Sequence, residues 1–216
     1  GGEVIVWETG RAGEEAASYE NLFLRKEIAG FRTNIRREQS CSIKSLTRDY
    51  LYKQLLSSGE YTFDHMLVIK DPYGEAPLTA LALFILEEPA CVRVTTKGNL
   101  KETDFVTELP KKKEHRVPIL GMYAEKANDI VIEILDDEGN CVKSHTFTIR
   151  TKRLPKSLRN VITVKKWTDK PAYSNIMING GVKIHTCVFD IEGKIRYYLS
   201  RKPRGYGIFP LSDGHF

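Results

Sequence analysis

The chain has 216 residues, 41% of them hydrophobic and 28% charged, which is typical of a globular protein with one large domain or two small ones. The longest largely apolar run, Leu78 to Leu86, is about half of the ~20 residues that a membrane helix needs, which excludes a transmembrane helix. The start of the chain shows no basic segment followed by a sustained apolar one, so no export signal is visible in it. The net charge of +5 supports solubility and does not indicate nucleic acid as a partner.

The N-terminal part of the chain, up to Glu60, predicts two helices, because its apolar residues recur at spacings of three and four. The first helix is expected between Gly13 and Gly30. Its predicted apolar face consists of Ala16, Tyr19, Phe23 and Ile28. The second is expected to begin after Ser40 or Ser42 and to end at Gly59. Its predicted stripe consists of Ile43, Leu46, Tyr50 and Leu55. We interpret residues 1–60 as a helical N-terminal arm.

From Tyr61 onward the apolar period changes to two and turn residues recur, as in an antiparallel β protein. The number of short strands favours a β-sandwich over residues 61–152. The seven predicted strands are 66–70, 78–86, 91–96, 105–109, 116–119, 130–135 and 141–150. Asp136 to Asn140 supplies a glycine and self-capping side chains, which predicts a hairpin between the last two.

Residues 151–158 are polar and basic and contain Pro155, which indicates a domain boundary. A β pattern resumes after it. The predicted strands are 160–166, 176–178, 182–190 and 194–199, and a further one begins at Gly205. The segment that follows the linker is short for a separate closed domain, so we infer that residues 153–216 begin a larger β architecture.

The four cysteines, Cys41, Cys91, Cys141 and Cys187, are widely and almost evenly spaced, and no C-x-x-C pair occurs. We interpret them as small buried hydrophobic residues, with an oxidised pair such as Cys91 and Cys141 as the alternative. The five histidines are also far apart in the sequence, so only the fold could gather them into a site. We interpret His65, His115, His145, His185 and His215 as surface or strand residues.

Three other clusters have both a functional and a structural interpretation. Lys111 to Lys113, with His115 and Arg116, could attract phosphate or sulfate, but a solvated loop is favoured. Asp136 to Glu138 lacks the spacing of a calcium loop, so the hairpin turn is favoured. The aromatic residues of the last third could stack on a ligand, but core packing is favoured. They are Trp167, Tyr173, Tyr197, Tyr198, Tyr206 and Phe209.

Four strings in the sequence resemble motifs of one known family. Residues 71–81, DPYGEAPLTAL, resemble a signature near the family's N-terminus, and residues 117–123, VPILGMY, resemble a following segment with Met122 in the usual leucine place. Residues 189–199, FDIEGKIRYYL, are similar to the family's D-x-x-G-x-x-R-W-x-L strand pair, with Tyr197 replacing the tryptophan. Residues 211–215, LSDGH, resemble its L-x-N-G-H turn. On these four strings the sequence resembles the bacterial arylsulfate sulfotransferases. The helical arm resembles the family only loosely, through residues 19–24.

The resemblance implies a mainly β protein in which an immunoglobulin-like β-sandwich precedes a β-propeller, with roughly one to one and a half blades in this chain. It implies an enzyme of the periplasm or cell surface, often a homodimer, that transfers a sulfuryl group from a phenolic sulfate ester to a phenol acceptor. A propeller histidine forms a sulfohistidine intermediate in that family, and no nucleotide sulfate donor is used.

No histidine of this sequence falls in a motif that matches the family's catalytic residues. We therefore expect no catalytic, cofactor-binding or metal-ligating residue and no cofactor in this chain, which alone should be inactive. The alternative function is that of a non-catalytic β-sandwich that binds an envelope component or mediates dimerisation.

Overall fold

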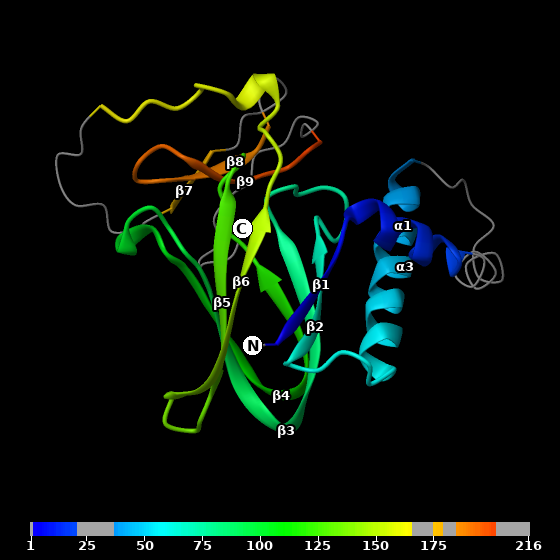
Figure 1. Ribbon diagram of the computed structural model, residues 1–216. Helices are drawn as coiled ribbons and strands as arrows, with labels where there is room; N and C mark the ends of the chain where they lie inside the picture. Colours follow the sequence, from blue (N-terminus) through cyan, green and yellow to red (C-terminus); the bar gives the residue numbers. More distant parts are fainter. Residues whose placement is uncertain (1, 21–36, 166–174, 179–184, 202–216) are drawn as a thin grey trace, which may run out of the picture.

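The computed structural model describes residues 2–20, 37–165, 175–178 and 185–201, and in this part of the chain it has two sheets and two α-helices (Figure 1). The helices are α1 (Thr9–Ala17) and α3 (Arg37–Ser57). The larger sheet contains β1 (Glu3–Trp7), β2 (His65–Lys70), β3 (Ala80–Thr96), β4 (Phe105–Ile119), β5 (Ala127–Leu135) and β6 (Cys141–Arg150). The smaller sheet contains β7 (Asn175–Ile178), β8 (Cys187–Asp190) and β9 (Ile195–Tyr198). Short 3-10 helices lie at Lys101–Thr103 and Lys156–Leu158.

The long strand β3 belongs to both layers of a sandwich. One edge of β3 pairs with β4, while the other pairs first with β2, where Leu83 faces Leu67, and then with β5, where Val94 faces Ile132. The register with β4 shifts between Ile85 and Val92, and such irregularities bend a strand. Figure 1 shows β3 and β4 curving from the layer of β1 and β2 to that of β5 and β6. The mainly β class and the immunoglobulin-like sandwich predicted from the sequence are therefore confirmed.

The sandwich core lies between the two layers and follows from the two-residue period of the strands. On β2 and β3 the even-numbered side chains, such as Met66, Val68 and Phe84, point into it and are fully buried. From the opposite layer Ile130 and Ile132 meet them. Burial of each such side chain stabilises the fold by roughly 1.5–3 kcal/mol, so this cluster is the main source of the domain's stability.

The odd-numbered side chains of β2 and of β3 before its bend face the helices instead. Leu67 and Leu83 pack with Trp7, Tyr52 and Leu56 in a second core, so β2 and this part of β3 are buried on both faces. In Figure 1 α1 and α3 cover the outer face of the layer that contains β1 and β2. Strand β1 runs parallel to β2, with Ile5 opposite Leu67, which requires a crossover connection, and α1 and α3 lie in it.

The helices differ from their predicted positions. Helix α1 begins at Thr9, earlier than expected, because its Ala12 and Ala16 face the second core. Phe23 and Ile28 lie outside the described residues. In α3 Leu46, which was expected on the buried stripe, is 44% exposed, whereas Thr47 and Leu51 are buried. One residue further along a helix, the side chain points roughly 100° away around the axis. The buried stripe is therefore shifted by one position.

Several expectations about the strands are corrected. The two strands predicted over residues 78–96 are one, β3, because Glu87, Glu88 and Pro89 lie at its bend and not in a turn. In the same way the strands predicted over residues 105–109 and 116–119 are one, β4, so Lys111 to Lys113 lie within it and not in a loop. Strand β1 was not predicted. Residues 161–165 form no strand. The Asp136 to Asn140 hairpin is confirmed, with Gly139 at φ +85°.

The cysteines are only partly the buried residues that the sequence predicts. Cys187 is buried, whereas Cys91 is half-buried and Cys141 is exposed, and all three are free thiols. Leu135 of β5 faces Cys91 on one side and Cys141 on the other, so a whole strand separates these two cysteines. This corrects the alternative of a Cys91–Cys141 disulfide. The side chain of Cys41 lies outside the described residues.

Buried His115 makes the stability of the sandwich depend on pH. Its ring stacks on Phe84 at 5.3 Å and its Nε2 lies 2.8 Å from the Lys112 carbonyl oxygen, while burial lowers the pKa of the imidazole. The unfolded chain then binds more protons than the folded one below about pH 6.5. We expect the free energy of unfolding to be highest above that pH and to fall as the pH drops from 6.5 toward the folded pKa.

The substitution His115→Gln tests this dependence. It should lower stability at neutral pH and reduce the loss of stability between pH 7.5 and 5.5, measured by urea unfolding at each pH. An unchanged dependence on pH in the variant would contradict the assignment to His115.

Candidate functional site

Three of the four family-like strings meet where the three-stranded sheet packs against the sandwich. In Figure 1 the orange strands β7, β8 and β9 lie across one end of the sandwich. A small apolar cluster joins the two parts. It contains Leu78, Leu158, Cys187, Phe189, Ile195 and Tyr198. We call this contact region the joint. Tyr198 is buried in this cluster, which confirms the prediction that it packs in a core.

The string at residues 71–81 connects three parts of the molecule. Toward the helices, the Pro72 carbonyl oxygen accepts hydrogen bonds from Arg48 and Tyr52 of α3. Toward the small sheet, the Glu75 carbonyl oxygen accepts a hydrogen bond from the Ser200 N–H at 2.8 Å, and its carboxylate pairs with Arg201 at 3.1 Å. The string then continues into β3 of the sandwich.

The local chemistry of this string explains its residue types. Asp71 has φ +45° and Gly74 has φ +74°, and the Asp71 Oδ1 accepts a hydrogen bond from the Ala76 N–H at 2.9 Å. Aspartate tolerates the left-handed region better than most residues and can cap its own turn. The turn carries Leu78 into the apolar cluster of the joint.

Arg196 of β9 is the central polar residue of the joint and is only 1% exposed. Its Nε donates to the Gly121 carbonyl oxygen at 2.6 Å, and its Nη1 donates to the Thr103 carbonyl oxygen at 2.8 Å. The guanidinium lies 3.9 Å from the centre of the Tyr123 ring and pairs with Asp190 at 3.2 Å. Its Nη2 is buried without a hydrogen-bond partner among the described residues. Arg196 therefore ties the small sheet to backbone groups of the sandwich.

Asp190 organises the turn between β8 and β9. Its Oδ1 accepts the N–H groups of Glu192 and Lys194, both at 3.0 Å, while its Oδ2 accepts the Tyr123 hydroxyl at 2.9 Å and faces Arg196. Gly193 has φ +75°, which favours glycine. The D-x-x-G-x-x-R spacing is therefore explained by a capped turn that holds a buried ion pair.

The tyrosines around the joint act as neutral hydrogen-bond donors. Burial raises the pKa of the Tyr123 hydroxyl, and burial raises the pKa of Tyr52 to about 12. Burial also raises the pKa of Tyr73, whose hydroxyl donates to Asp49 at 2.6 Å. These hydroxyls stay protonated at neutral pH and position backbone and carboxylate groups.

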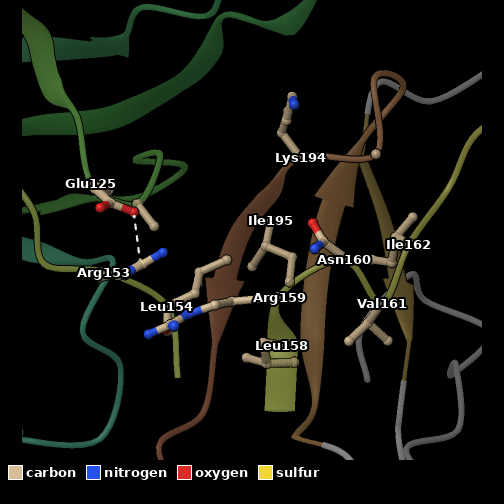
Figure 2. A pocket seen from close by; sticks show the side chains of 12 residues that line it. Glu125, Arg153, Leu154, Leu158, Arg159, Asn160, Val161, Ile162, Lys194 and Ile195 are labelled. Carbon is tan, nitrogen blue, oxygen red and sulfur yellow. Dashed lines mark hydrogen bonds and ion pairs between the residues drawn. The ribbon is translucent and has the colours of Figure 1, made fainter. Parts of the chain in front are cut away.

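A cavity of about 340 Å³ opens beside the joint (Figure 2). It lies between the chain segment that follows β6 and the turn between β8 and β9. Its lining combines Arg153, Arg159 and Lys194 with Glu125 and apolar residues. Arg153 pairs with Glu125 at 3.4 Å, and the Arg159 Nε donates to the Leu154 carbonyl oxygen at 2.8 Å. A second cavity, of about 490 Å³, lies at the bend of β3.

The structure does not bring the sequence-predicted candidates together at the joint. The histidines lie in or beside strands, as predicted: His65 in β2, His115 in β4, His145 in β6 and His185 before β8. His215, Trp167, Tyr173, Tyr206 and Phe209 lie outside the described residues. Over the described ranges, no group of three or more His, Cys, Asp or Glu residues is placed to hold a metal ion.

The importance of Arg196 was missed from the sequence, because a single arginine among strand aromatics reads as a surface residue. The D-x-x-G-x-x-R spacing was the one signal that could have identified it.

Comparison with known proteins assigns the sandwich to a family. Residues 67–152 match the family model of the arylsulfotransferase Ig-like domain. This range contains two of the four strings and all of β3 to β6. The chain therefore carries an arylsulfotransferase Ig-like domain, and the resemblance inferred from the motifs is confirmed. A search of the curated proteins finds no match to the chain. In the part that the structure describes, no helix is long and apolar enough to cross a membrane.

Loss of the Arg196 side chain should weaken the joint. Arg196→Leu leaves the Asp190 carboxylate buried without its cation, which typically costs about 3–5 kcal/mol. We expect a corresponding fall in the free energy of unfolding and faster amide hydrogen exchange in β8 and β9. The matched control is Arg153→Leu, because Arg153 is 62% exposed and its ion pair should contribute within about 0.5 kcal/mol. Equal effects of the two substitutions would contradict the role of Arg196.

A glycine series tests the close approach at the joint. Gly121 has φ +76°, and a Cβ there would lie 2.6 Å from the Phe105 Cβ, so Gly121→Ala should cost about 2–4 kcal/mol. Gly139 has φ +85° with open space around it, so Gly139→Ala should cost only about 1 kcal/mol. Gly10 lies within α1 with nothing near it, so Gly10→Ala should stabilise by about 0.5–1 kcal/mol. Chemical denaturation of the three variants measures this order, and a reversed order would refute it.

Proposed function

We propose that this chain serves an arylsulfate sulfotransferase as its Ig-like domain, together with the sheet that the domain supports. The observation that carries the proposal is the match of residues 67–152 to the arylsulfotransferase Ig-like domain. The joint adds support, because residues of three family-like strings contact one another there. Gly121 and Tyr123 contact Arg196, and Leu78 packs with Phe189.

In this proposal the domain has an orienting role. The antiparallel order of β7, β8 and β9 is compatible with a propeller blade, and we propose that it belongs to the first one. The hydrogen bonds of Arg196 then hold the blade at a fixed angle to the sandwich. A domain attached in this way gives the propeller a rigid neighbour and needs no catalytic side chain of its own.

The proposed reaction is sulfuryl transfer between phenols. A propeller histidine outside the residues described above attacks the sulfur atom of a phenolic sulfate ester, so that an N–S bond forms, the S–O bond breaks and phenolate leaves. The oxygen of the acceptor phenol then attacks the sulfur atom of the sulfohistidine, so that a new S–O bond forms, the N–S bond breaks and the histidine is restored. The proton of the acceptor phenol passes to solvent and balances the proton that the released phenolate takes up. We further propose that the enzyme acts in the periplasm or at the cell surface as a homodimer.

The test is a sulfuryl-transfer assay on the complete product of the gene and on this chain. With 4-nitrophenyl sulfate as donor and phenol as acceptor, the complete product should release 4-nitrophenol in proportion to the acceptor consumed. Donor alone should leave one SO₃ group on a histidine, detected by peptide mass spectrometry. This chain should give no turnover. Absence of transfer by the complete product would refute the proposal and favour a non-catalytic binding module, whereas turnover by this chain would refute its orienting role.

A further inference from the structure

The cavity beside the joint has an excess of positive charge. Arg153, Arg159 and Lys194 line it, and among the described lining residues the carboxylate of Glu125 is the one acidic group. A concave surface with a surplus of cations raises the local concentration of anions. The charge of this cavity therefore favours an anionic ligand over a neutral or cationic one.

Arg153 and Arg159 contribute guanidinium groups to the lining of the cavity. In Figure 2 the guanidinium groups of Arg153 and Arg159 lie on the same side of the cavity, while Lys194 projects away from them. The hydrogen bond to the Leu154 carbonyl oxygen uses the Nε of Arg159, and this contact fixes the side chain. Its Nη atoms make no hydrogen bond to the residues that the structure describes, so they can donate to a ligand. Guanidinium groups bind the oxygens of carboxylate, sulfate or phosphate groups through paired hydrogen bonds.

The rest of the cavity wall is apolar. Leu158, Val161, Ile162 and Ile195 supply aliphatic surface beside the two arginines. Leu158 is buried in the apolar cluster of the joint, which anchors this wall. The volume of about 340 Å³ falls in the range of small-molecule sites. An apolar wall beside a cationic edge matches a ligand with one apolar and one anionic end.

We propose that this cavity binds a small amphipathic anion, namely an apolar body that carries one carboxylate, sulfonate or phosphate group. The apolar body packs on Val161, Ile162 and Ile195, and the anionic oxygens accept hydrogen bonds from Arg153 and Arg159. This inference goes beyond the proposed function, because it concerns a separate binding site and requires no sulfuryl transfer.

A ligand in this cavity should also stabilise the joint. The cavity is lined by the segment after β6 and by the turn that Asp190 organises, so the ligand contacts both parts at once. A ligand that binds only the docked arrangement stabilises that arrangement. Binding should therefore slow amide hydrogen exchange in β8 and β9.

The test uses the whole chain, residues 1–216, with 2-naphthalenesulfonate as the probe. Calorimetric titration should show saturable binding, and nuclear magnetic resonance shifts should concentrate at residues 153–162 and 193–195. The neutral 2-naphthol and inorganic sulfate should each bind at least tenfold more weakly, since each lacks one half of the recognised chemistry.

Substitutions separate this site from adventitious binding. Arg159→Gln should weaken binding of the probe by about tenfold or more, and Arg153→Gln, at an exposed position, should weaken it even if the first variant unfolds. The matched control is Arg93→Gln, because Arg93 makes ion pairs with Glu108 and Glu133 on the sandwich outside this cavity. Equal binding of 2-naphthol and the sulfonate, or unchanged affinity in both cavity variants, would overturn the proposal.

Discussion

The buried guanidinium of Arg196 is the constraint on which the arrangement of the two sheets depends. A buried charge is costly unless it is paired and hydrogen-bonded, and the partners that offset this cost come from different segments. Asp190 comes from the small sheet, while Gly121, Thr103 and Tyr123 come from the sandwich. Partial docking would leave the charge unsatisfied. The interaction therefore favours one docked geometry.

This view changes how the family-like strings are understood. Sequence signatures are often taken as catalytic, yet here several residues of the strings have a structural role. Pro72 offers a carbonyl oxygen to the helices, Gly121 permits a close approach to Phe105, and Asp190 caps a turn. An Ig-like domain that packs against a second sheet needs such connectors.

The sequence predicted most of the elements but not their junctions. Period-two patterns located β2, β5, β6 and β9 because one or both faces of each strand are buried. The sequence predicted β3 as two strands because Glu87 to Pro89 resemble a turn. Only the pairing with β4 on one edge, and with β2 and β5 on the other, shows that these residues bend a single strand. Strand β1 was not predicted because its partner β2 is distant in the sequence and follows both helices. The buried position of Arg196 was not predicted because burial of one charge depends on tertiary contacts that no local pattern encodes.

The lysine run of β4 has a consequence for association between molecules. Among the described strands β4 pairs only with β3, so its other edge offers unpaired backbone groups that could recruit a strand from a second chain. Lys111 to Lys113 are exposed on that strand, and Pro110 before them has no N–H to donate. Two such edges would repel each other and could not form a regular ladder. The run that the sequence predicted as a solvated loop is thus a safeguard against edge-to-edge aggregation of the sandwich.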